Sequence, residues 1–80
     1  MMLEWDVWPR DPTGPRLAMG NSQTMKAAQE AVEAVLAAND DALFGIAGGI
    51  YGPQLMCRRG RPSGYVWQET SRVQPISSGN

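Results

Sequence analysis

The stretch NSQTMKAAQEAVEAVLAAND, residues 21–40, decides the fold because it predicts the clearest helix in the chain. Its apolar side chains recur at helical spacing and form one stripe, while charged and amide side chains fall on the opposite side. Alanine, the best helix former, is abundant in it. The apolar stripe consists of Met25, Ala28, Val32, Val35 and Leu36, and the opposite side carries Lys26, Gln29, Glu30 and Glu33.

Polar residues mark both ends of this helix. Asn21, Ser22 or Thr24 can each act as N-cap, because their side-chain oxygens accept a hydrogen bond from an otherwise unpaired amide. Asn39 follows the last apolar position and predicts a C-cap in the left-handed conformation. The helix is therefore bounded, amphipathic and in need of a partner for its apolar face.

The residues before the helix predict two strands. In LEWDVW, residues 3–8, the side chains at positions 3, 5 and 7 point one way and Glu4, Asp6 and Trp8 point the other. The loop PRDPTGP, residues 9–15, contains three prolines and a glycine and cannot continue a ladder. RLAM, residues 16–19, returns as the second strand of a hairpin.

Three more strands follow the helix. ALFGIAGGIY, residues 42–51, is apolar on both faces, which is typical of a central strand. Gly48 and Gly49 inside it indicate a bulge or a close backbone approach. QLMCRR, residues 54–59, and YVWQETSRV, residues 65–73, are joined through GRPSG.

These elements predict an α+β fold of order ββαβββ. One antiparallel sheet of four to five strands, with the amphipathic helix on one face, buries both apolar surfaces. Eighty residues suffice for one domain, which we assign to residues 1–74, with residues 75–80 as a frayed C-terminal tail.

Composition narrows the classes of function. With 42% hydrophobic and 19% charged residues, the chain suits a folded protein and not a disordered one. Its formal net charge of -1 is not the basic excess of a dedicated nucleic-acid binder.

The single cysteine and the lack of histidine exclude an intramolecular disulfide and leave few ligands for zinc. We therefore expect no metal and no cofactor. A lone thiol fits the reducing cytoplasm. The N-terminus lacks the basic and then apolar run of a signal peptide, and the uncharged stretch 42–57 is too short to span a bilayer. We expect a cytoplasmic location away from membranes.

Catalytic residues are not evident either. Cys57 has no histidine to activate it, and a buried thiol is the expected state. The paired carboxylates, Glu4 with Asp6 and Asp40 with Asp41, come with no obvious pocket. We expect the protein not to be an enzyme.

The segment CRRGRPSG, residues 57–64, carries three of the seven basic residues. Its core Arg59-Gly60-Arg61-Pro62 resembles the AT-hook family, and the resemblance implies that Arg59 and Arg61 insert into the minor groove of A·T-rich DNA. It covers four residues, and no further basic residue follows Pro62 until Arg72. The turn residues predict instead a hairpin loop. Nucleic-acid binding through Arg58–Arg61 is the alternative function.

Aromatic and arginine side chains near this loop predict a protein-binding surface, because these residue types dominate interface hot spots. The alternative is that its aromatic side chains pack against the proline-rich loop 9–15. The predicted partner-binding residues are Arg58, Arg59, Arg61, Tyr65 and Trp67.

In size and element order, the chain resembles small phage-encoded inhibitors, including several type I anti-CRISPR proteins. This resemblance implies a non-enzymatic interaction module that binds a large bacterial protein or complex of the host and blocks it. A homodimer is a further possibility, since an exposed strand edge can pair with its own copy.

Overall fold

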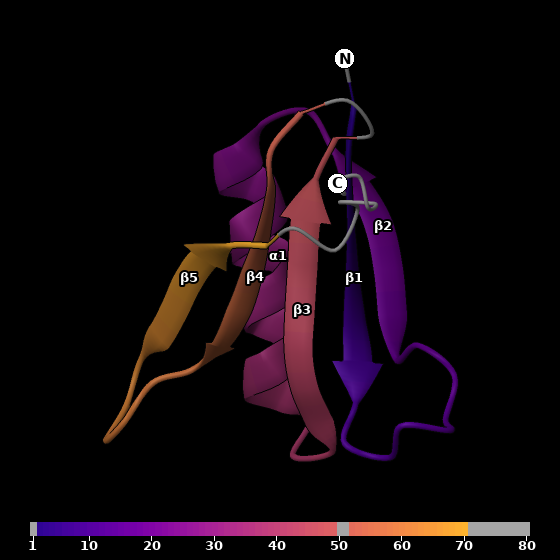
Figure 1. Cartoon of the computed structure of the whole chain (residues 1–80), viewed down its shortest axis with the longest axis vertical. Helices are drawn as coiled ribbons and strands as arrows, with labels where there is room; N and C mark the ends of the chain where they lie inside the picture. Colours follow the sequence, from indigo (N-terminus) through magenta and orange to yellow (C-terminus); the bar gives the residue numbers. More distant parts are fainter. Residues whose placement is uncertain (1, 50–51, 71–80) are drawn as a thin grey trace, which may run out of the picture.

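A computed structural model of the chain describes residues 2–49 and 52–70, in which one helix packs on a five-stranded antiparallel sheet (Figure 1). The predicted α+β class and the order ββαβββ are confirmed. The predicted tail, residues 75–80, and the end of the predicted domain, residues 71–74, lie outside the described residues. The elements are β1 (Leu3–Pro9), β2 (Ala18–Ser22), α1 (Met25–Ala38), β3 (Ala42–Gly48), β4 (Gln54–Arg59) and β5 (Tyr65–Glu69).

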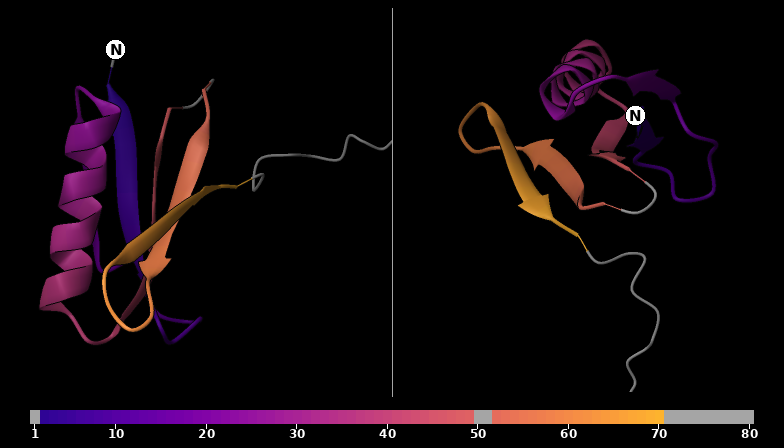
Figure 2. Two further views of the ribbon diagram at one scale, coloured as in Figure 1. Left: turned by 90° about the vertical axis from the view of Figure 1, so that its left-hand side faces the viewer. Right: turned by 90° about the horizontal axis from the view of Figure 1, so that it is seen from above.

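The strand order in the sheet is β2-β1-β3-β4-β5. The N-terminal hairpin and the C-terminal three-stranded meander join where β1 pairs with β3, with Glu4 opposite Gly48 and Val7 opposite Gly45. The helix lies on one face of the sheet, mainly over β1 and β3, and β5 turns away from the direction of the other strands (Figure 2). Within residues 2–49 and 52–70, no helix or strand covers the opposite face.

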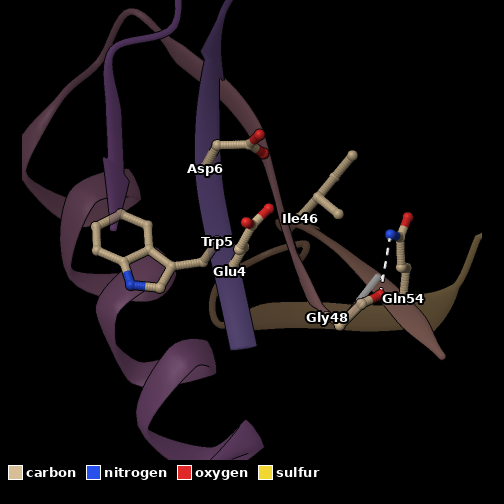
Figure 3. A pocket seen from close by; sticks show the side chains of 7 residues that line it. Glu4, Trp5, Asp6, Ile46, Gly48 and Gln54 are labelled. Atoms are coloured by element: carbon tan, nitrogen blue, oxygen red, sulfur yellow. Dashed lines mark hydrogen bonds between the residues drawn. The ribbon is translucent and has the colours of Figure 1, made fainter. Parts of the chain in front are cut away.

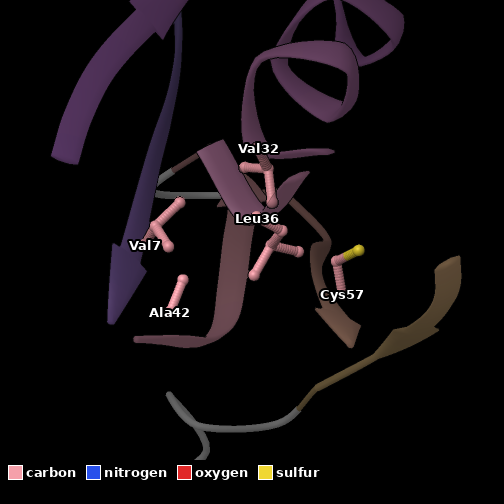
Figure 4. Close-up of a cluster of buried hydrophobic side chains, with 5 residues drawn as sticks. All are labelled: Val7, Val32, Leu36, Ala42 and Cys57. Carbon is pink, nitrogen blue, oxygen red and sulfur yellow. The ribbon is translucent and has the colours of Figure 1, made fainter. Parts of the chain in front are cut away.

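The core forms between α1 and the facing side chains of the sheet. The predicted stripe is confirmed, because Ala28, Val32 and Leu36 are its fully buried members. Around this core pack the half-buried side chains Trp5, Val35, Tyr65 and Trp67. The central cluster consists of Val7, Val32, Leu36, Ala42 and Cys57 (Figure 4).

Glycines allow two close approaches in β3. A Cβ atom on Gly45 would collide with Cγ1 of Val32, so the helix can only lie this close to the sheet over a glycine. A Cβ atom on Gly48 would lie 2.5 Å from the carbonyl oxygen of Pro53. The close approach predicted at Gly48 is therefore confirmed, while the irregularity in the β1–β3 register lies between Trp8 and Pro9.

The helix ends are capped by three different side chains. Thr24 is the N-cap, and its Oγ1 accepts a hydrogen bond of 3.1 Å from the amide of Ala27. The left-handed conformation predicted for Asn39 is wrong, because its φ and ψ of -131° and 110° are extended. Its backbone amide and its side-chain amide both donate to the carbonyl oxygen of Val35, so this end of the helix needs no left-handed residue. Arg59 supplies the third cap and is described below.

The second strand differs from its prediction. β2 spans Ala18–Ser22 and not residues 16–19, so Asn21 and Ser22 lie in a strand and are not helix caps. The pairing with β1 explains why β2 begins and ends later than predicted, because Val7 pairs with Ala18 and Leu3 pairs with Ser22. The predicted strand 42–51 ends at Gly48, before the undescribed residues 50–51, and the described part of strand 65–73 ends at Glu69.

Candidate protein-binding surface

The pleat of the sheet places alternate side chains on two faces with different surroundings. We call the side opposite α1 the open face. Its residues are set by the register, since Met19, Asp6 and Ile46 are cross-strand neighbours, and so are Trp8 and Phe44. Towards β5, Met56 pairs with Gln68 and Arg58 pairs with Val66.

The open face carries apolar side chains across most of its width, and the exposed ones are on its two outer strands. Met19 is 62% exposed and Val66 is 50% exposed, while Trp8, Phe44 and Met56 between them are half-buried. Ile46 lies in the middle and is almost completely buried by its neighbours. Exposed apolar side chains that form a contiguous surface are typical of interaction sites.

One end of the open face is acidic. Glu4 and Asp6 line a pocket of about 30 Å³, with Ile46 and Gln54 on the same side of the sheet and Trp5 directed to the other (Figure 3). This volume has room for about one water molecule. The carboxylate of Asp6 is engaged, because it accepts hydrogen bonds from Nε1 of Trp8 at 3.1 Å and from Arg16 at 3.4 Å.

The other end of the open face is basic. A pocket of about 350 Å³ opens there, which we call the arginine pocket, and none of the described residues that line it is acidic. Four of the seven basic residues of the chain line this one pocket, although the protein as a whole has a net charge of -1. Its lining residues are Arg10, Leu43, Arg58, Arg59, Gly60 and Arg61.

Arg59 is held by the end of the helix. Its Nη2 donates to the carbonyl oxygens of Leu36 at 2.6 Å and Asn39 at 2.8 Å, and its Nη1 donates to that of Ala42 at 2.6 Å. A cation is favoured at this position, where the helix dipole is negative. Arg59 is therefore bound to the end of α1, and its guanidinium group does not lie at the exposed tip of the predicted hairpin loop.

The other arginines of the pocket are less engaged. Arg10 ties its loop to the turn after α1, because its Nε donates to the carbonyl oxygen of Asp40 at 3.0 Å and its amide donates to that of Asp41 at 2.8 Å. The side chains of Arg58 and Arg61 make no hydrogen bond or ion pair with any residue that the structure describes. These two guanidinium groups are therefore available to a ligand.

The five predicted partner-binding residues do not share one surface. Arg58 lies on the open face and Arg61 lies in the adjoining loop, whereas Tyr65 and Trp67 lie on the helix side, packed against the core. Nε1 of Trp67 donates to Oε2 of Glu33 at 2.8 Å, so Glu33 is half-buried and does not point away from the sheet. These aromatic side chains thus extend the core, and they do not pack against loop 9–15.

The segment CRRGRPSG forms the end of β4 and the β4–β5 loop, as the hairpin prediction requires. The amide of Gly60 donates to the carbonyl oxygen of Gly64 at 2.7 Å, and the positive φ of 85° at Gly64 closes the turn. The segment is therefore not the extended peptide of an AT-hook. Of the two arginines in the four-residue match, Arg59 uses three of its five N–H donors on carbonyl oxygens, whereas Arg61 makes no side-chain hydrogen bond to any residue that the structure describes.

No protein-family model, curated protein or solved structure matches the chain. No helix in residues 2–49 and 52–70 is long and apolar enough to cross a membrane.

Cys57 lies on the helix side of β4 and is fully buried. Burial, and to a smaller extent the negative charge of Glu33, raises the pKa of its thiol to about 12. The thiol is therefore protonated near neutral pH, and the protonated form is a poor nucleophile.

Sequence reasoning missed two residues of the arginine pocket, Arg10 and Leu43. Arg10 directly follows β1 and Leu43 belongs to β3, so both are distant in sequence from the loop near residue 60. The pairing of β1 with β3, and of β3 with β4, brings them to one end of the sheet. The alternation in LEWDVW did indicate part of the open face, because it placed Trp8 on the same side of the strand as the carboxylates of Glu4 and Asp6.

Proposed function

We propose that the protein is a small non-enzymatic interaction module that binds a large bacterial protein complex in the cytoplasm and blocks it. The open face is the binding surface in this proposal. The proposal extends the resemblance to small phage-encoded inhibitors such as type I anti-CRISPR proteins. The observation that carries it is the row of apolar side chains across the open face, exposed at Met19 and Val66 and half-buried or buried between them, with an acidic end and a basic end.

The chemistry of this face suits a protein partner. Apolar and aromatic side chains such as Met19, Trp8 and Val66 gain free energy when a partner removes them from water. Arginines such as Arg58 are frequent hot spots. These side chains stand on a paired sheet, so little backbone conformational entropy is lost when they bind. The partner surface that fits is apolar in the middle, basic opposite Glu4 and acidic opposite the arginine pocket.

The alternative function is nucleic-acid binding through Arg58–Arg61. The unpaired guanidinium groups of Arg58 and Arg61 favour it. Two features weigh against it, since Arg59 spends its terminal donors on carbonyl oxygens and the open face also carries Glu4 and Asp6. Few phosphates can be neutralised by the remaining arginines, and binding would be weak at physiological salt.

Affinity capture from cells that make the protein tests the proposal, with nuclease treatment to separate the two classes. The variant Met19→Ser/Val66→Ser removes exposed apolar contacts, and Ala34→Ser/Ala37→Ser is the matched control on the solvent side of α1. We expect a protein partner that survives nuclease, is lost with the first variant and is kept with the second. Recovery of nucleic acid alone, or equal capture by both variants, would refute the proposal.

The alternative partner is a second copy of the protein, and a homodimer is distinguished from a complex with a different protein as follows. β2 and β5 are the outer strands of the sheet, and each has one unpaired edge among the described residues. Sedimentation of the purified protein across a range of concentrations separates self-association from capture of a different protein.

A further inference from the structure

Among the described residues, no acidic side chain lines the arginine pocket, although the protein as a whole has a net charge of -1. Its four guanidinium groups come from three segments of the chain: Arg10 follows β1, Arg58 and Arg59 end β4, and Arg61 lies in the β4–β5 loop. Among the described residues, the ion pair that forms is between Arg16 and Asp6, which do not line this pocket. Like charges this close together repel, and an anion that binds between them relieves the repulsion.

Arg10, Arg58 and Arg61 have more hydrogen-bond donors left for a ligand than Arg59 has. Arg59 is fixed at the base by three carbonyl oxygens and contributes charge but few donors. Arg58 and Arg61 present whole guanidinium forks, and Arg10 keeps its terminal nitrogens after Nε is used. A guanidinium fork matches a carboxylate with two parallel hydrogen bonds.

An apolar residue lies beside these forks. Leu43 lines the arginine pocket and is 36% exposed, so the pocket combines a cationic rim with an apolar contact. Free inorganic anions make no use of such a contact, whereas a peptide offers carboxylates and apolar side chains at neighbouring positions. The pocket also adjoins Arg58 on the open face, and is continuous with the surface assigned to the partner.

We propose that the arginine pocket binds an acidic segment of the protein partner, with carboxylates on Arg58 and Arg61 and an apolar side chain on Leu43. This inference rests on the proposed function and names the chemistry of the partner at one end of the open face. A nucleic-acid strand fits less well, because its phosphates continue beyond the pocket. The carboxylates of Glu4 and Asp6, which lie farther along the open face, would repel the phosphates outside the pocket.

A peptide titration tests the inference on the full chain. The probe is a fluorescein-labelled eight-residue peptide with three glutamates around one leucine, and its binding is followed by fluorescence anisotropy. We expect saturable binding that weakens with added salt. Arg58→Gln and Arg61→Gln should each weaken it at least fivefold, whereas Lys26→Gln, which removes a positive charge from the exposed side of α1, should leave it unchanged.

Control probes decide the class of ligand. The same peptide with glutamines in place of the glutamates should not bind, and a twelve-base-pair duplex should bind more weakly than the acidic peptide at physiological salt. Tighter binding of the duplex, equal binding of the glutamine peptide, or no effect of Arg58→Gln and Arg61→Gln would overturn the inference.

The two proposals fail in different ways. Capture of a partner that depends on Met19 and Val66 but not on Arg58 and Arg61 would overturn the acidic-segment inference alone. If the protein captures no protein partner, the proposed function is refuted, and the peptide titration then shows whether the pocket still binds carboxylates.

Discussion

Nη2 of Arg59 donates a 2.6 Å hydrogen bond to the carbonyl oxygen of Leu36, and so ties the last residue of β4 to the last turn of α1. The final carbonyls of a helix have no partner within the helix itself. Many helices meet this need with a glycine in the left-handed conformation, whereas here a side chain from a distant strand supplies the donors. Arg59 thereby fixes the helix end against the sheet.

We expect Arg59→Ala to lower the free energy of unfolding by about 2 kcal/mol, since hydrogen bonds to charged groups contribute on this scale. Arg59→Lys should recover only part of the loss, because an ammonium group cannot reproduce the planar fork. Urea denaturation followed by circular dichroism measures both. Arg61→Ala is the control and should change the stability by less than about 0.5 kcal/mol. Equal midpoints for Arg59→Ala and Arg61→Ala would contradict the capping role.

Val32→Asp and Leu36→Asp should each prevent cooperative folding, because each would bury an unpaired charge in the central cluster. Thermal melts followed by circular dichroism check this expectation. Glu30→Ala is the control, since Glu30 is exposed on α1 and should tolerate the change. Glu33→Ala would not serve, because Glu33 accepts a hydrogen bond from Trp67. A normal melting transition for either aspartate variant would show that the helix is oriented differently.

Gly45→Ala should destabilise the protein by about 1–3 kcal/mol, the usual cost of overpacking, because the new Cβ atom meets Cγ1 of Val32. In a Val32→Ala background the same substitution should cost less, since the colliding methyl group is gone. Chemical denaturation of the two single variants and the double variant gives the interaction free energy between positions 32 and 45. Additive effects would mean that the contact between α1 and β3 is looser than described.

The stability should fall as the pH rises from about 9 to about 12, in part because of Cys57. The pKa of its thiol is raised from 9.0 to about 12 by burial and then by Glu33. In this window the unfolded chain loses the thiol proton while the folded protein keeps it, which favours unfolding. Cys57→Ala should show a shallower decline of stability over that range. Fast alkylation of the native thiol at neutral pH would contradict this account.

Local patterns in the sequence predicted most of the fold. The spacing of Ala28, Val32 and Leu36 predicted the buried face of the helix, and the alternation in LEWDVW predicted which side of β1 meets it. The limits of β2 could not be predicted in this way. Gly20, Asn21 and Ser22 have turn propensity, and only their pairing with β1 holds them in a strand.

The binding surface was predicted less well, because it depends on contacts between distant segments. Arg58 and Arg61 were correctly placed beside a hairpin loop, but nothing near Arg59 in the sequence indicated that the end of α1 would accept its hydrogen bonds. Tyr65 and Trp67 were assigned to the partner surface by residue type. Their position over the edge of the core follows from the twist of β5 and from the hydrogen bond to Glu33.

The pairing of β1 with β3 also governs the order in which this protein can fold. Glu4 meets Gly48 only after the chain between them has been synthesised, so the central seam of the sheet closes a long loop and is a slow, non-local event. Before that, a nascent chain that ends with α1 has β1 with one unpaired edge and Val32 without its glycine partner. Such an intermediate presents an unpaired strand edge that can pair with another chain. We therefore expect chains truncated after residue 41 to aggregate under conditions in which the full chain stays monomeric or forms an oligomer of defined size.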